Sequence, residues 1–171
     1  YTFLLDGEVW ATRCRQRDAV CLTTPGRRFQ VGATDAVIHD GVVRESGIYF
    51  TQVDAHLIRV NRESLEVEQT IDLSEMMSGL RKPGWTRGLH VVDEDRVIVG
   101  FTRMRPTKWS NNLSWVKLNE LRYLYRLPAR VCLFNLREQR MEWEVPLQKF
   151  GMTTVFTVHP ESDAAEGRVA A

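Results

Sequence analysis

The phrase Gly-x-Thr occurs three times in this chain, and a different polar residue follows the threonine each time. These residues are Asp35 after the phrase at Gly32, Arg87 after the phrase at Gly84, and Thr154 after the phrase at Gly151. A carboxylate, a guanidinium and a hydroxyl that meet at one place are groups that bind and orient a small anionic ligand. The repeated phrase therefore predicts a ligand site, provided that the fold brings the three positions together.

Asp35 and Arg87 are open to three interpretations. In the first, the chain is an enzyme of the lyase or hydrolase type, with Asp35 as the general base and Arg87 neutralising an anionic substrate. In the second, Arg87 binds the anion and no reaction follows. In the third, the two side chains form an ion pair with each other and have only a structural role. The sequence favours a binding module and leaves catalysis open.

The segment 103–129 is rich in basic and aromatic side chains. From Arg103 to Arg130 there are seven basic residues and one acid, and the basic residues are Arg103, Arg105, Lys108, Lys117, Arg122, Arg126 and Arg130. Guanidinium groups bind carboxylates and phosphates through paired hydrogen bonds, and aromatic rings stack on planar ligands. Arg103, Arg105 and Trp109 are therefore predicted to bind the ligand, with the segment as a short helical lid.

Two other partners fit the same segment. It could instead be a docking surface for another protein, with its aromatic side chains as buried anchors. Nucleic acid is the less favoured partner, because the chain has no nucleic-acid motif and its net charge is only +1. The predicted partner is an anionic small molecule or an acidic protein segment.

Three of the four histidines, His39, His90 and His159, fall on expected strands that follow the Gly-x-Thr phrases. They lie 7, 6 and 8 residues after the respective glycines. Because alternate residues of a strand face opposite sides, His39, His90 and His159 are weak candidates for a shared metal site. We keep His90 as a candidate ligand-binding residue, and the sequence predicts no cofactor.

Short apolar runs, rich in β-branched and aromatic residues, recur along the chain and are bounded by turn-forming residues. Val9, Ile48 and Val97 begin equivalent runs, 39 and 49 residues apart, which fits the roughly 40 to 50 residues of a four-stranded propeller blade. The stretches "GIYFTQVDAHLIRVNRESLEVEQTIDL" and "RGLHVVDEDRVIVGF" resemble the β-propeller repeat superfamily. The resemblance is to the six- or seven-bladed NHL, YncE-like and quinoprotein-like propellers. It covers about residues 1–160 and implies a fold but no activity.

The predicted fold is an all-β partial propeller over residues 1–160, followed by a polar tail, 161–171. Its parts are blades at 1–32, 33–73 and 84–147, an inner strand at 151–159, and the insertion 103–129. Such rings close with four to eight blades, so further blades or a second chain are expected partners. In a blade, the connection that holds Gly-x-Thr and the loop between the second and third strands lie on one face. The insertion should therefore lie on the face that carries Asp35 and Arg87.

Composition and cysteine spacing indicate the class of protein and its location. The 171 residues are 43% hydrophobic and 26% charged, as in ordinary globular proteins. No apolar run approaches the roughly 20 residues of a membrane span, and no signal peptide can be read. Cys14, Cys21 and Cys132 have no metal-binding or disulfide spacing, which favours a reducing, cytoplasmic location. Cys14 has Arg13, Arg15 and Arg17 nearby and is either a reactive thiol or a spectator.

Overall fold

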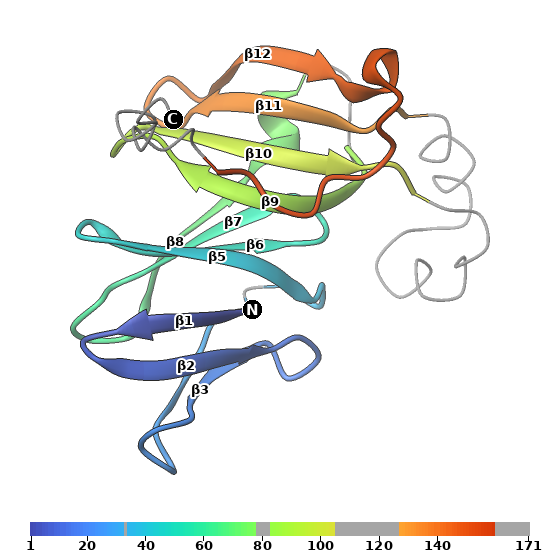
Figure 1. Ribbon diagram of the computed structural model, residues 1–171. Coiled ribbons are helices and arrows are strands. Elements are labelled where there is room, and N and C mark those ends of the chain that lie inside the picture. Colours follow the sequence, from blue (N-terminus) through green and yellow to red (C-terminus); the bar gives the residue numbers. More distant parts are fainter. Residues whose placement is uncertain (33, 78–82, 105–126, 160–171) are drawn as a thin grey trace, which may run out of the picture.

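The computed structural model describes residues 1–32, 34–77, 83–104 and 127–159, in which nearly all regular structure is antiparallel β-sheet (Figure 1). Sheet 1 consists of β1 (Thr2–Leu5), β2 (Glu8–Arg13), β3 (Asp18–Cys21) and β4 (Arg28–Gln30). Sheet 2 consists of β5 (Ile38–Arg44), β6 (Gly47–Gln52), β7 (His56–Val60) and β8 (Val67–Asp72). Sheet 3 consists of β9 (Trp85–Val91), β10 (Arg96–Thr102), β11 (Arg130–Asn135) and β12 (Arg140–Pro146). The prediction of an all-β fold is confirmed.

Within each sheet, neighbouring strands in space are also neighbours in the chain. Local turn chemistry explains this order. The turn between β1 and β2 is Asp6-Gly7, with φ of 49° and 81°. Two positive φ angles give the turn a twist that matches a tight hairpin, and Asp-Gly is a preferred pair there. At the β7–β8 turn, the side chain of Asn61 accepts hydrogen bonds from the N–H groups of Glu63 and Ser64 at 2.8 and 3.0 Å.

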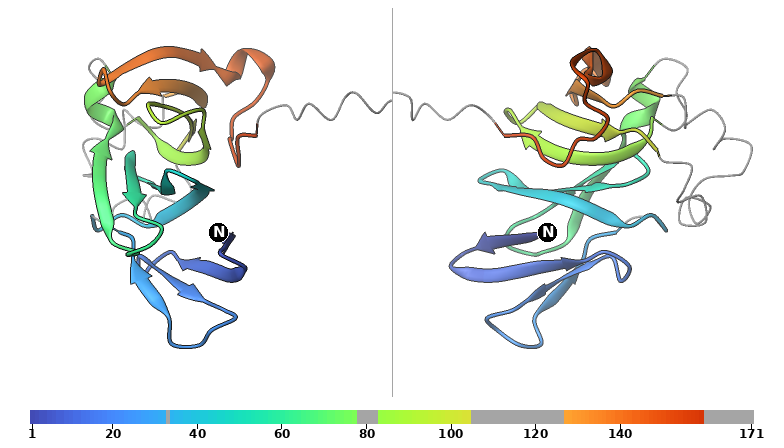
Figure 2. Two further views of the ribbon diagram at one scale, coloured as in Figure 1. Left: turned by 90° about the vertical axis from the view of Figure 1, so that its left-hand side faces the viewer. Right: turned by 45° about the vertical axis from the view of Figure 1, so that its right-hand side comes forward.

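The three sheets stack on one another, with β5 beside both β1 and β9 (Figures 1 and 2). Two apolar cores hold the stack together. The first lies between sheets 1 and 2 and contains Phe3, Trp10, Phe29, Ile48, Phe50, Ile58 and Val60. The second lies between sheets 2 and 3 and contains Tyr49, Leu57, Leu89, Val97, Val99, Phe101, Cys132 and Phe134. Burial of these alternating side chains is the main favourable contribution to folding.

Two 3-10 helices follow the last strands of sheets 2 and 3. The helix η1 (Leu73–Met76) begins after Asp72, whose carboxylate accepts a hydrogen bond from the Ser74 N–H at 2.9 Å. The helix η3 (Leu147–Phe150) ends at Gly151, which has a φ of 74°. No helix in the described part of the chain is long and apolar enough to cross a membrane.

The segment after Gly151 lies against sheet 3. Thr102 Oγ1 donates to Val155 O at 2.8 Å and accepts from Val155 N at 3.0 Å. Residues 152–159 are in no sheet of the described structure, so the inner strand at 151–159 stays a prediction. The long insertion is seen in the strand bounds, because β10 ends at Thr102 and β11 begins at Arg130. Residues 105–126, where we expected a helix, lie outside the described residues.

Each Gly-x-Thr phrase is hydrogen-bonded to the sheet that precedes it in the chain. Arg17 Nη1 donates to Thr34 O at 2.6 Å, Thr86 N donates to Val53 O at 3.3 Å, and Arg103 N donates to Thr153 O at 3.3 Å. Each bond links the Gly-x-Thr phrase that follows a sheet to the segment between that sheet's second and third strands. We call the side of the molecule that carries these bonds the turn face.

The glycines of the three phrases have different roles. Gly84 and Gly151 have φ of 120° and 74°, as expected for a turn that favours glycine. Gly32 does not have a positive φ. A Cβ at Gly32 would lie 2.4 Å from Arg17 Cβ, so glycine is needed there for close approach.

Candidate ligand-binding sites

The structure places Asp35 and Arg87 in different settings. Asp35 lies in the connection before β5, where its side chain is 97% exposed and accepts a hydrogen bond from Arg17 Nη1 at 2.8 Å. Arg87 lies within β9, with its guanidinium carbon 5.9 Å from the ring centre of Trp85 and 5.3 Å from that of Phe156. The two positions are therefore not equivalent, and their joint role with Thr154 stays a prediction.

Arg87 lies near Asp40 of β5. The Asp40 carboxylate accepts a hydrogen bond from the Gly88 N–H at 2.6 Å and lies 3.5 Å from His39 Nδ1. Burial by itself would raise the pKa of Asp40, but His39, the Gly88 N–H and the positive charge of Arg87 together hold it below its usual value. Asp40 thus bridges the first strands of sheets 2 and 3.

Two further side chains, His90 of β9 and Tyr1 before β1, have shifted pKa values. Burial lowers the pKa of His90, and the positive charges of Arg44 and His159 lower it further. Burial also raises the pKa of Tyr1, and so does the negative charge of Asp40. Of the histidines expected on inner strands, His39 lies edge-on to Trp85 with ring centres 6.5 Å apart. Within the described residues, no group of three or more His, Cys, Asp or Glu side chains could hold a metal ion.

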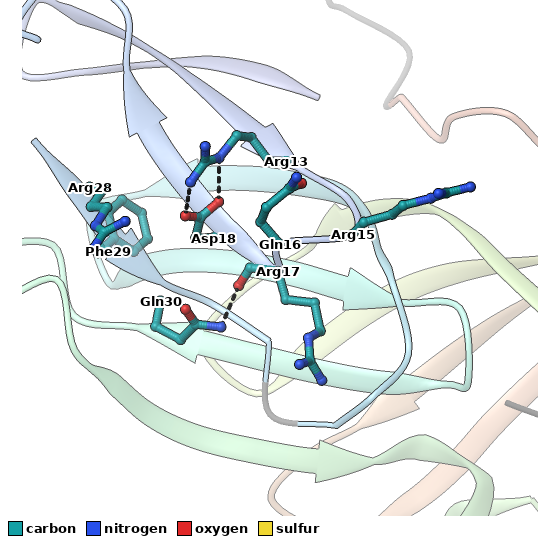
Figure 3. Close-up of a pocket in the computed structure, with 8 residues that line it drawn as sticks. All are labelled: Arg13, Arg15, Gln16, Arg17, Asp18, Arg28, Phe29 and Gln30. Carbon is teal, nitrogen blue, oxygen red and sulfur yellow. Dashed lines mark hydrogen bonds and ion pairs between the residues drawn. The ribbon is translucent and has the colours of Figure 1, made fainter. Parts of the chain in front are cut away.

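A separate pocket of about 520 Å³ opens where β2 turns into β3 (Figure 3). Four arginines line it, and the only acidic side chain among the lining residues is Asp18. The lining residues are Arg13, Arg15, Gln16, Arg17, Asp18, Arg28, Phe29 and Gln30. We call this hollow the arginine pocket.

The backbone around the arginine pocket is tightly fixed. Arg17 adopts a left-handed backbone with a φ of 59°, and its carbonyl points toward the end of β4. That carbonyl accepts hydrogen bonds from Val31 N at 3.0 Å, Gly32 N at 2.8 Å and Gln30 Nε2 at 3.0 Å. The backbone of the turn is thus already ordered before a ligand binds, which lowers the entropic cost of binding.

Two of the four arginines are already in ion pairs. Arg13 donates to both oxygens of Asp18, with Nε 2.8 Å from Oδ1 (Figure 3). These bonds hold the pKa of Asp18 below its usual value against the effect of burial, and the charge of Arg28 acts in the same direction. Arg17 pairs with Asp35. Arg15 and Arg28 form no ion pair with any described residue, so positive charge remains for a ligand.

Sequence reasoning gave Arg13, Arg15 and Arg17 a role only as neighbours of Cys14, which is exposed. A signal was present in the sequence, because three of the five residues from Arg13 to Arg17 are arginines. Gln30 and Arg28 could not be added from sequence, because they reach the pocket only through the pairing of β4 with β3.

The arginines at the two ends of the basic segment lie in different environments. Arg130 is buried and donates to Pro83 O at 2.5 Å and Pro128 O at 3.1 Å, so its charge stabilises the fold and does not face a ligand. Arg103 lies on the turn face, where its N–H holds Thr153. The predicted ligand-binding residues Arg105 and Trp109 lie outside the described residues.

No protein-family model matches this chain, and comparison with the curated proteins also found no match.

Proposed function

We propose that the chain is part of a β-propeller that binds an anionic small molecule or an acidic protein segment on its turn face. The propeller assignment is supported by three successive four-stranded sheets whose first strands lie side by side. Rings of this kind close with about four to eight blades. Further blades or a second chain are therefore needed to complete it.

The arginine pocket is the observation that carries the binding function. Four guanidinium groups and one carboxylate line it, and the turn at Arg17 together with the pairing of β4 with β3 brings them to one place. Guanidinium groups bind carboxylates and phosphates more strongly than single-point cations do, because they offer paired donors. The alternative of a lyase or hydrolase gains no support from Asp35, whose exposed carboxylate is paired with Arg17.

Isothermal titration calorimetry with tripolyphosphate and with poly-L-glutamate tests the proposal by measuring the affinity for each polyanion. We expect at least one of these polyanions to bind to the wild type. The double variant Arg15→Ala/Arg28→Ala should bind it at least about tenfold more weakly, because the loss of one charged hydrogen bond typically lowers affinity by about that factor. The matched control is Arg137→Ala/Arg140→Ala, which removes the same charge from exposed positions near β12. Equal weakening in both double variants would mean that only net charge matters, and would refute a pocket.

A further inference from the structure

His56 begins the third strand of sheet 2 and lies between two carboxylates. Its Nδ1 lies 3.0 Å from Asp54 Oδ1, in the turn between β6 and β7, and its Nε2 lies 3.9 Å from Asp72 Oδ2, at the end of β8. The side chains of His56 and Asp54 are only 16% and 8% exposed. Both ring nitrogens therefore face a negative charge where solvent screens it only in part.

Each carboxylate uses its other oxygen to hold a neighbouring connection. Asp54 Oδ2 accepts a hydrogen bond from Thr34 Oγ1 at 3.0 Å, in the connection that leads into β5. Asp72 Oδ1 accepts hydrogen bonds from Ser74 N at 2.9 Å and from Ser74 Oγ at 2.6 Å, at the start of η1. His56 thus lies between the connection that enters sheet 2 and the helix that follows its last strand.

The number of protons on the imidazole decides how many carboxylates it can hold. A neutral imidazole carries one N–H and can donate to one carboxylate, whereas an imidazolium carries two and can donate to both. Two carboxylates close to the ring also favour its charged form against the effect of burial. Only the protonated ring of His56 can therefore serve Asp54 and Asp72 together.

Sheet 3 has a permanently charged side chain at the equivalent place. Arg130 begins the third strand of that sheet, and its Nε lies 3.3 Å from Glu144 Oε2 on the fourth strand. A guanidinium keeps its charge throughout the physiological pH range, whereas the imidazole of histidine ordinarily titrates at about pH 6.5. Sheet 2 thus has a titratable form of a contact that is constant in sheet 3.

The other charged side chains of the elements around His56 have different surroundings. Asp35, in the same connection as Thr34, is 97% exposed and pairs with Arg17. Glu75 of η1 is exposed. Of the carboxylates on these described elements, the two within ion-pair distance of the imidazole are Asp54 and Asp72.

We infer that His56 is a pH-sensitive latch that ties the connection into sheet 2 to the start of η1 when its ring is protonated. Below about pH 6.5, the imidazolium holds Asp54 and Asp72 together and contributes to stability. As the pH rises and the ring loses its proton, one of the two contacts lacks a donor and this contribution is lost. The inference concerns the stability of the turn face and does not depend on the proposed ligand binding.

A double-mutant cycle of His56→Gln and Asp72→Asn, followed by thermal unfolding at two pH values, tests the latch. Glutamine is neutral at every pH, and asparagine can still accept the hydrogen bond from Ser74 N at the start of η1. At about pH 5.5, the two single losses in midpoint temperature should together exceed the loss in the double variant by at least about 2 °C. At about pH 8 this excess should disappear, because the neutral ring donates to the nearer Asp54.

The matched control is the cycle of Arg130→Met and Glu144→Gln, which removes the equivalent contact of sheet 3. Its coupling should be the same at both pH values, because the guanidinium does not titrate in this range. Equal coupling of His56 with Asp72 at both pH values would show a constant hydrogen bond and overturn the latch, and so would the absence of coupling at both. If His56→Gln does not fold, Asp72→Asn alone decides, because its loss in midpoint should be larger at about pH 5.5 than at about pH 8. An equal loss at the two pH values would overturn the inference.

Discussion

Replacing Arg130 by methionine should destabilise the fold far more than removing a surface arginine. The Arg130 side chain is 2% exposed, donates to the carbonyls of Pro83 and Pro128, and lies 3.3 Å from a carboxylate oxygen of Glu144. Methionine is unbranched and apolar and fills much of the space, so the change removes mainly the charge and its hydrogen bonds. It leaves two carbonyls without this donor and one carboxylate without its cation.

The magnitude follows from these lost partners. Removing one member of a buried ion pair typically costs about 3 to 5 kcal/mol, and a buried acceptor left unsatisfied costs about 1 to 3 kcal/mol. Glu144 is 33% exposed and regains water, so we expect a total of about 3 to 5 kcal/mol for Arg130→Met. The control is Arg137→Met, because Arg137 pairs with Asp95 at 2.7 Å while 75% exposed. That change should cost no more than about 1 kcal/mol.

Urea unfolding followed by tryptophan fluorescence measures both variants. The m-value should stay unchanged, so that the shift in midpoint reports the free energy of unfolding. Adding Glu144→Leu to Arg130→Met should recover part of the loss, since the unpaired carboxylate is then gone. Equal destabilisation by Arg130→Met and Arg137→Met would show that the Arg130 network contributes no more than a surface pair, and would refute the reasoning.

Three further predictions concern pH, thiol access and close packing. His90 has a pKa below its unfolded value of 6.5, so its contribution to stability is present above pH 6.5 and is lost as the pH falls through 6.5 towards the folded pKa. His90→Gln should therefore flatten the thermal-unfolding profile between about pH 7 and 5, and an unchanged slope would contradict this. In a thiol titration with an aromatic disulfide, Cys14 should react in the native protein, whereas Cys21 and Cys132 should react only after unfolding, because both are buried and burial raises the pKa of Cys132 to about 12. Gly32→Ala should cost about 1 to 3 kcal/mol in urea unfolding, because the new Cβ would lie 2.4 Å from Arg17 Cβ; stability equal to the wild type would show that the turn moves freely.

The sequence by itself determined the sheets and their order. Val9, Ile48 and Val97 were expected to begin equivalent runs, and each is the second residue of β2, β6 or β10. The place of the insertion was also predicted, since β10 and β11 flank it. These features are local: alternating side chains and turn residues act within one hairpin, so each can be read from a short stretch of chain.

Tertiary structure decided which polar side chains meet. Asp35 and Arg87 follow the same phrase, yet one lies in a connection and the other lies inside a strand, because the number of residues before the strand differs. Arg130 was counted with the basic segment, but the packing of β11 buries it against the carbonyl of Pro83. The arginine pocket depends on the pairing of β4 with β3 and on the turn at Arg17. Such meetings are set by register and by stacking between sheets, which leave no periodic signal in the sequence.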